Sequence, residues 1–483
     1  MEKQNSQPGN ETKLLTLSEF RRELGIPLIL AKKLLVLGEI GVVRAVDGTI
    51  RIAAPEVAIA KKLIGTPLSR ARLFVKALGP GLVTGASDDD PGGIGTYSSV
   101  GAAFGLSILW MAAWLLPVMT AIQEVCARIG VVTNKGLAGV LKLHYNRKVL
   151  ISAVTLLLIA NIVNIGADLG AMAASIGMFT NVSFYMIIIV LTAVITLLEI
   201  LVEYHLYVRV LKFLTISVFA YIATGIMANP HWIDVLKNAF VPHLSLNKDY
   251  LFAMVAVFGT TITPYLFFWQ ASEEVEEGKL LTGSKHMKRG MRDRITHMRT
   301  DVYTGMLLAN VVFFFIVLTT AQVLFTHGIT NIDSAQDAAL ALAPFAGKHA
   351  AALFAMGIIG TGLLAIPVLA GSGAYALAEV LNWNEGLELK FSQAKGFYVV
   401  IALSIIFGGL FNFFSINPIT ALYYSAFLNG VIAVPLLYLI MKVGDDPKVM
   451  GEERHPGWVR IFGWLGVLAM AVALVVMVIM SVL

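Results

Sequence analysis

The run from Ala86 to Gly93, ASDDDPGG, interrupts a stretch that otherwise has the composition of a transmembrane helix. A charge near the bilayer midplane costs ~2.5 kcal/mol or more, Pro removes a backbone donor, and Gly weakens a helix. Such a break is tolerated only where protein covers the freed backbone or where it lines a cavity. The run therefore predicts a broken helix that holds a cation at mid-membrane.

The composition of the whole chain supports a membrane setting. Of its 483 residues, 57% are hydrophobic and only 14% are charged, which indicates a polytopic membrane protein rather than a soluble enzyme. The single cysteine, Cys126, excludes an intramolecular disulfide and a Cys-based metal cluster. The net charge of +5 is explained by Lys and Arg on cytosolic loops, so nucleic-acid binding is not expected.

Apolar stretches of about 20 residues recur about eleven times along the chain. Lys and Arg cluster after the second, sixth and tenth stretches, within 135–148, 279–299 and 448–454. The positive-inside rule places these loops in the cytosol, together with the N-terminus, and no secretory signal precedes the first span. We therefore expect an integral protein of the cytoplasmic membrane. The predicted spans are 80–104, 106–132, 149–179, 183–203, 206–228, 250–272, 302–327, 350–381, 397–412, 417–441 and 458–483.

The sixth span repeats the irregularity of the first. Residues 259–264, GTTITP, put Gly, three hydroxyls and Pro at mid-membrane. Two breaks five spans apart are the signature of a five-plus-five inverted repeat. The predicted fold is all-α, with about eleven helices, a LeuT-like repeat and broken helices one and six. Four acidic residues end the sixth span, Glu273, Glu274, Glu276 and Glu277. They either draw cations toward an inner vestibule or form a solvated helix end.

Residues 1–76 are polar and form a separate module, before a transporter-like domain of residues 77–483. The pattern predicts a capped helix from Leu17, a second helix to about Leu37, a hairpin of 42–44 with 50–52, and a helix over 55–63. This order is similar to a winged-helix module. A structural or regulatory role is favoured over nucleic-acid binding because the segment is only mildly basic.

The chain resembles the Nramp family of divalent-metal transporters over about residues 77–483. The resemblance rests on GPGLV at 79–83, DPG at 90–92, ARIGV at 127–131 and ADL at 167–169. Family members typically read Asp-Pro-Gly-Asn in helix one and Met-Pro-His in helix six. Here the corresponding positions are Gly93 and Thr263-Pro264-Tyr265. This pattern is similar to the Nramp-related magnesium-transporter branch.

The same departures favour a hard cation on chemical grounds. A thioether is a soft ligand that selects transition metals, whereas carboxylate, hydroxyl and carbonyl oxygens suit Mg²⁺ and Mn²⁺. By the resemblance, the metal site comprises Asp90, Gly93 and Thr263 with the carbonyls of Ser87 and Thr260. Asp89 is a further candidate, which touches either the ion itself or its hydration shell. Possible pathway or outer residues are Asp88, Tyr265, Asp168 and Asn429.

Two proton-carrying groups of the family are missing. Asp168 matches a family carboxylate of proton transfer, but the second acid is Ala171 and the helix-six His is Tyr265. We therefore predict a secondary transporter of Mg²⁺, and of Mn²⁺ second, by alternating access without proton coupling, with no cofactor and no enzymatic activity. One alternative is a proton-coupled Mn²⁺/Fe²⁺ importer. The other is a membrane-tethered metal sensor that signals through residues 1–76.

Overall fold

A computed structural model of the protein describes residues 14–24, 40, 42–44, 50–63, 80–202, 215–283, 290–387 and 389–482. The chain divides into two compact units, residues 1–79 and residues 80–483. Because the two units are separate bodies, each is described by itself.

The first unit contains a small antiparallel sheet in the order β1-β3-β2. The predicted hairpin is present, since β2 (Val42–Arg44) pairs with β3 (Ile50–Ala53) and places Val43 opposite Arg51. Helices α1 (Leu17–Leu24) and α3 (Ala54–Leu63) match the first and third predicted helices. Strand β1 (Leu14–Leu15) was not predicted. The second predicted helix lies outside the described residues.

The second unit is a bundle of long helices. Nine segments of the described residues are long and apolar enough to cross a membrane, and one of them joins α14 to α15. The first predicted span is divided into two short helices, and the fifth lies partly outside the described residues. The long helices are α7 (Trp110–Thr133), α9 (Arg147–Gly177), α10 (Phe184–Leu201), α16 (Met291–Val323), α19 (Ala350–Leu381), α20 (Lys395–Phe411), α21 (Pro418–Asp445) and α23 (Gly457–Val482).

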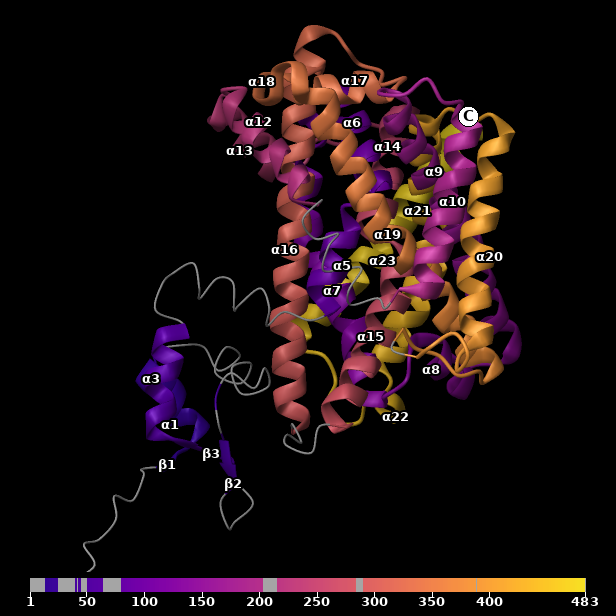
Figure 1. Ribbon diagram of the computed structural model, residues 1–483. Helices are drawn as coiled ribbons and strands as arrows, with labels where there is room; N and C mark the ends of the chain where they lie inside the picture. The colour runs from indigo at the N-terminus through magenta and orange to yellow at the C-terminus, as the bar shows by residue number, and fades with distance from the viewer. Residues whose placement is uncertain are drawn as a thin grey trace, which may run out of the picture. The chain divides into compact units, whose positions relative to one another are not determined.

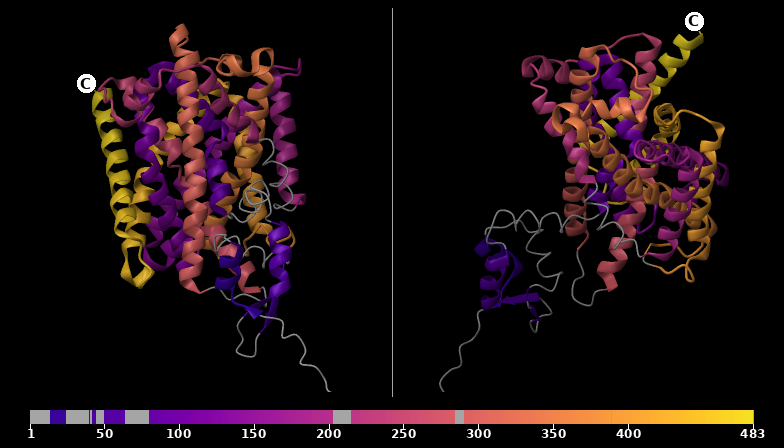
Figure 2. Two further views of the ribbon diagram at one scale, coloured as in Figure 1. Left: turned by 90° about the vertical axis from the view of Figure 1, so that its left-hand side faces the viewer. Right: turned by 45° about the horizontal axis from the view of Figure 1, so that its top comes forward.

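Short helices gather at the two ends of the bundle. One end carries α12 (Ala220–Met227), α13 (Trp232–Phe240), α17 (Ala335–Leu340) and α18 (Ala343–Ala346) (Figure 1). The opposite end carries α8 (Leu137–His144), α22 (Pro447–Met450) and the last turns of α15. The views in Figure 2 show the long helices running between these two ends. The described loops that hold α8 and α22, after the second and tenth spans, therefore share one end with the last turns of α15 in the sixth, as the predicted topology requires. The loop after the fourth span lies outside the described residues.

The first span breaks where the sequence predicts. Helix α5 (Pro80–Asp88) ends directly before Asp89, and α6 (Pro91–Phe104) begins at Pro91. Asp90 is the N-cap residue of α6, and its Oδ1 accepts a hydrogen bond of 2.6 Å from the Gly93 amide. Pro suits the first helical position because its missing N–H would have no intrahelical partner there. The run thus ends one half-helix and begins the next.

The sixth span breaks in the same manner. Helix α14 (Lys248–Thr261) ends before Ile262, and α15 (Pro264–Gly283) begins at Pro264. Both second half-helices therefore start with Pro. In Figure 1, α6 and α14 lie toward the end with α12 and α13, while α5 and α15 extend toward the end with α8.

Glycines allow close helix crossings on both sides of the breaks. A methyl group at Gly85 of α5 would lie 2.3 Å from the Gly305 carbonyl oxygen of α16. A methyl group at Gly259 of α14 would lie 2.0 Å from the Ala426 carbonyl oxygen and 2.2 Å from the Gly430 nitrogen of α21. Backbones pack directly on each other at these crossings, as small residues permit in membrane helices.

Candidate cation site

Asp90 lies at the centre of the candidate site, between α5 and α6. Its side chain is 3% exposed, although a carboxylate is normally solvated. Oδ1 accepts from the Gly93 amide at 2.6 Å, and Oδ2 lies 3.2 Å from the Tyr265 hydroxyl. The carboxylate is therefore oriented from both broken helices, which holds it in place for a ligand.

Tyr265 connects the two breaks. Its hydroxyl is 2.7 Å from the Ser87 carbonyl oxygen and 3.2 Å from Asp90 Oδ2. A phenol has one proton, so it donates to one of these acceptors at a time. A carbonyl oxygen has two lone pairs, so a cation bound to the Ser87 carbonyl would share that oxygen with the hydroxyl. Sequence reasoning placed Tyr265 outside the ligand set, and the structure brings it into contact with two candidate ligands.

Asp88 and Asp89 are both buried beside Asp90. Among the described residues, none forms a hydrogen bond with Asp88 Oδ1 or Asp89 Oδ1. Buried oxygens without partners are costly unless a cation or water satisfies them. Yet no three His, Cys, Asp or Glu side chains of the described residues converge closely enough to hold one metal ion together. The run is therefore not a three-carboxylate cage.

The remaining predicted members of the site are oxygen-bearing or have no side chain. Thr260 and Thr263 are 5% and 1% exposed, and within the described part of the chain Thr263 Oγ1 has no hydrogen-bond partner. A methyl group at Gly93 would lie 2.9 Å from the Asp88 carbonyl oxygen and 3.5 Å from Asp90 Oδ1. The backbone at Gly93 therefore packs too closely against the Asp88 carbonyl for a side chain, and only its main chain lies beside the Asp90 carboxylate.

Asp168 and Asn429 approach the site from α9 and α21. Asp168 is fully buried, close enough to Asp90 for their charges to interact, and lies beside the Gly92 backbone. Neither of its carboxylate oxygens has a hydrogen-bond partner among the described residues. Asn429 donates a hydrogen bond of 3.1 Å to Asn164 Oδ1. Asn429 thus joins α21 to α9, and its role as a ligand stays a prediction.

Tyr97 and Thr261 are neighbours of the site that sequence reasoning missed. Their hydroxyl oxygens lie 3.0 Å apart, and the Tyr97 ring stacks on Phe313 at a centroid distance of 4.1 Å. Tyr97 is close enough to Asp88 and Asp89 to interact with their charges. The sequence spacing could have predicted the position of Tyr97, because it follows Asp90 by about two helical turns and therefore lies on the same face of α6.

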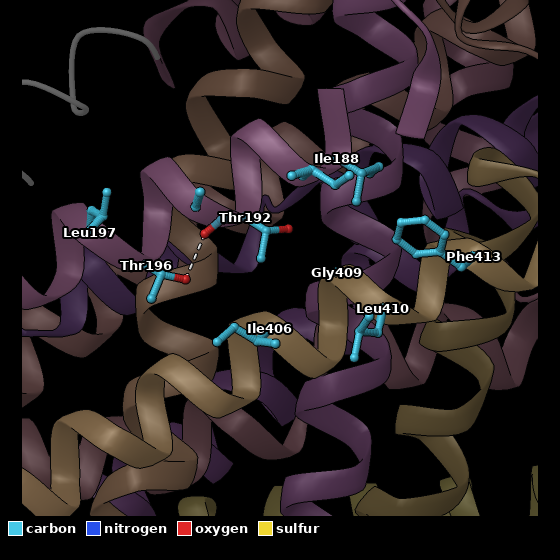
Figure 3. Close-up of a pocket in the computed structure, with 10 residues that line it drawn as sticks. Ile188, Thr192, Thr196, Leu197, Ile406, Gly409, Leu410 and Phe413 are labelled. Carbon is cyan, nitrogen blue, oxygen red and sulfur yellow. Dashed lines mark hydrogen bonds between the residues drawn. The ribbon is translucent and has the colours of Figure 1, made fainter. Parts of the chain in front are cut away.

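An apolar groove elsewhere in the bundle does not qualify as the cation site. It has a volume of about 440 Å³ and lies between α10 and α20 (Figure 3). The side chains drawn there are aliphatic, aromatic or threonine, and Thr196 Oγ1 already donates to the Thr192 carbonyl at 2.7 Å. A groove without a carboxylate offers little to a divalent ion.

Comparison with known proteins decides the family. The family described as natural resistance-associated macrophage protein-like, or Nramp, matches residues 81–480. The chain belongs to the Nramp family. It is 28% identical over 418 residues to the divalent metal cation transporter MntH of Klebsiella pneumoniae subsp. pneumoniae, covering 84% of this chain and 94% of the relative. The resemblance found in the sequence is thereby confirmed, and the protein is an integral membrane protein.

Solved structures confirm the fold. A manganese transporter from Eremococcus coleocola, in complex with an aromatic bis-isothiourea compound, matches with a TM-score of 0.65 and 18% identity, covering 83% of this chain and 86% of that one. A nucleobase-cation-symport-1 family transporter in a closed conformation matches with a TM-score of 0.53 and 12% identity, covering 82% and 92%. The predicted all-α, LeuT-like architecture with broken helices one and six is therefore correct.

Proposed function

We propose that this Nramp protein transports divalent metal cations across the cytoplasmic membrane by alternating access, with Mg²⁺ as first substrate and Mn²⁺ as second. Family membership and the name of the Klebsiella relative support the divalent-metal class. The ion is cargo, and no cofactor is required.

The observation that carries the preference is an all-oxygen set of candidate ligands at the two breaks. The Asp90 carboxylate, the Thr263 hydroxyl and the Ser87 carbonyl are hard ligands, and no sulfur or imidazole accompanies them in the sequence of either break. Mg²⁺ retains much of its water and usually binds through one or two carboxylates.

The proposal includes transport without proton coupling. The residue one helical turn after Asp168 is Ala171, which has no titratable group to carry a proton. At the break in the sixth span, Tyr265 stands where the family has His. Membrane potential alone is sufficient as a driving force. Moving a charge of +2 inward across 100 mV releases about 4.6 kcal/mol, at about 2.3 kcal/mol per charge, which sustains a gradient above about a thousandfold.

Flux into proteoliposomes that contain a Mg²⁺ dye and a pH dye tests both parts. We expect Mg²⁺ uptake that rises with an inside-negative potential and leaves the internal pH unchanged. Absence of Mg²⁺ uptake alongside Mn²⁺ uptake would contradict the substrate preference. Internal acidification in proportion to metal uptake would instead support the proton-coupled Mn²⁺/Fe²⁺ importer.

A further inference from the structure

One face of α15 leads away from the candidate site. Tyr265, which contacts Asp90, is in the first turn of α15. Trp269 and Glu276 follow four and eleven residues later, so the helical repeat of 3.6 residues places all three on one face. Over eleven residues the helix rises about 16 Å. This face therefore extends from the site toward the end of the bundle that the loop charges predict to be cytosolic.

Trp269 fills the space between α15 and α19 directly beyond the site. Its side chain is fully buried, and a methyl group at Gly371 of α19 would lie 2.8 Å from its Cζ3 atom. The indole also meets the Tyr375 ring edge-to-face, with a centroid distance of 6.2 Å. Gly371 thus provides the room that the indole occupies, and the packed pair fills the space between the two helices.

Glu276 is bound on the far side of that packed pair. Its Oε1 accepts a hydrogen bond of 2.7 Å from the Tyr375 hydroxyl and one of 3.1 Å from the Leu387 amide. The Tyr375 hydroxyl also lies 3.4 Å from Glu273 Oε1. A methyl group at Gly386 would be 2.4 Å from Glu276 Oε1, so the backbone passes close to the carboxylate. These contacts join α15 to α19 and to the segment that follows α19.

We propose that the cytosolic exit for the ion runs between α15 and α19. Trp269 is its barrier, the Tyr375–Glu276 hydrogen bond holds it closed, and Glu273 and Glu276 receive the departing ion. The ion's class rests on the proposed function, but the route rests on this packing. A route between α5 and α16 would instead have to separate two backbones, because Gly85 packs directly on Gly305.

The closing contact is tested by thiol accessibility. The background is Cys126→Ala, which removes the single cysteine, with Ser87→Cys as a reporter at the fully buried Ser87 position. In this background Tyr375→Phe should increase labelling from the cytosolic face by a membrane-impermeant thiol reagent about tenfold or more, since a hydrogen bond to a carboxylate is lost. Trp269→Ala should do the same by removing the barrier.

Tyr398→Phe is the matched control. The Tyr398 hydroxyl donates to the Leu389 carbonyl, so it binds the segment after α19 from α20. Equal labelling in Tyr375→Phe and Tyr398→Phe would overturn the closing role. Amide hydrogen exchange across residues 269–279 tests the closing role without the reporter cysteine. Exchange that is faster in Tyr375→Phe but not in Tyr398→Phe supports the closing role. Exchange in Tyr375→Phe equal to that of the parent refutes it.

The ion-receiving role is tested by flux in Glu276→Gln. The amide oxygen still accepts from Tyr375 and Leu387, though as a weaker, neutral acceptor. Labelling should therefore rise less than in Tyr375→Phe, while Mg²⁺ or Mn²⁺ flux falls severalfold. Glu277→Gln, on another face of α15, is the control and should keep its flux. Unchanged flux in Glu276→Gln would refute this role. Both ions are measured, so transport of Mn²⁺ alone would contradict the proposed substrate while leaving the route testable.

Discussion

Asp90 combines two tasks that substitution can separate. It caps α6 through the Gly93 amide, and it is the best candidate ligand of the ion. Asn caps a helix about as well as Asp, whereas Ala loses ~1 kcal/mol, with a range of about 0.5–2 kcal/mol. Asp90→Asn should therefore fold and unfold thermally like the parent protein, while Asp90→Ala should show a lower unfolding midpoint.

The charge governs binding instead. A +2 ion and a carboxylate about 4 Å apart attract by about 8 kcal/mol at an effective dielectric constant of about 20. If desolvation cancels three quarters of this, about 2 kcal/mol remains, which corresponds to a Kd about thirtyfold weaker in Asp90→Asn.

Calorimetric titration with Mg²⁺ and Mn²⁺, paired with thermal unfolding in detergent, measures the two effects separately. A parental Kd in Asp90→Asn would refute the ligand assignment. A midpoint in Asp90→Asn as low as that in Asp90→Ala would refute the capping argument.

Three further predictions address selectivity, pH dependence and packing. Thr263→Met combined with Gly93→Asn should shift transport toward Mn²⁺ because a thioether is soft; an unchanged Mg²⁺/Mn²⁺ flux ratio would contradict this. Burial raises the pKa of Glu385, in the segment after α19, to about 8. The folded state therefore holds a proton that the unfolded chain releases. The contribution of Glu385 to the free energy of unfolding is complete at acidic pH and is lost as pH rises through about 8. Glu385→Gln should accordingly raise the unfolding midpoint by a few degrees at pH ~9 and not at pH ~4, and equal shifts at both values would be inconsistent with the assignment. Gly85→Ala should lower the free energy of unfolding by about 1–3 kcal/mol because a methyl group there meets α16. In Gly177→Ala the methyl group meets no described atom within 4 Å, so the change should be under about 1 kcal/mol. Similar losses in the two variants would refute the close crossing.

The two breaks could be predicted because they violate what a lipid-buried helix tolerates. Pro91 and Pro264 lack the backbone N–H of a helix hydrogen bond, and a run of acidic or hydroxyl residues precedes each of them at mid-membrane. The residues at which the helices begin and end were harder to predict. Helix α16 begins at Met291, eleven residues before the predicted span at 302, because an amphipathic helix continues beyond the bilayer while hydrophobicity marks only the part within it.

The contacts of the aromatic side chains could not be predicted. Tyr97, Trp269 and Tyr375 each have the pattern of an ordinary core residue in an apolar helix. Their roles depend on partners that folding brings from other helices, such as Gly371 for Trp269. Tyr265 follows the second break directly in the sequence, but its contact with the Ser87 carbonyl depends on how two half-helices meet.

The crossing of α14 and α21 also restricts how this protein can evolve. Gly259 and Gly430 meet backbone to backbone, so neither position has a side chain left to lose. In most cores a larger residue on one side can be accommodated by a smaller one opposite. Here the opposing residue has no side chain that could become smaller, so neither glycine can be replaced by a larger residue. Lineages descended from this protein should keep both glycines even where the ion they carry has changed.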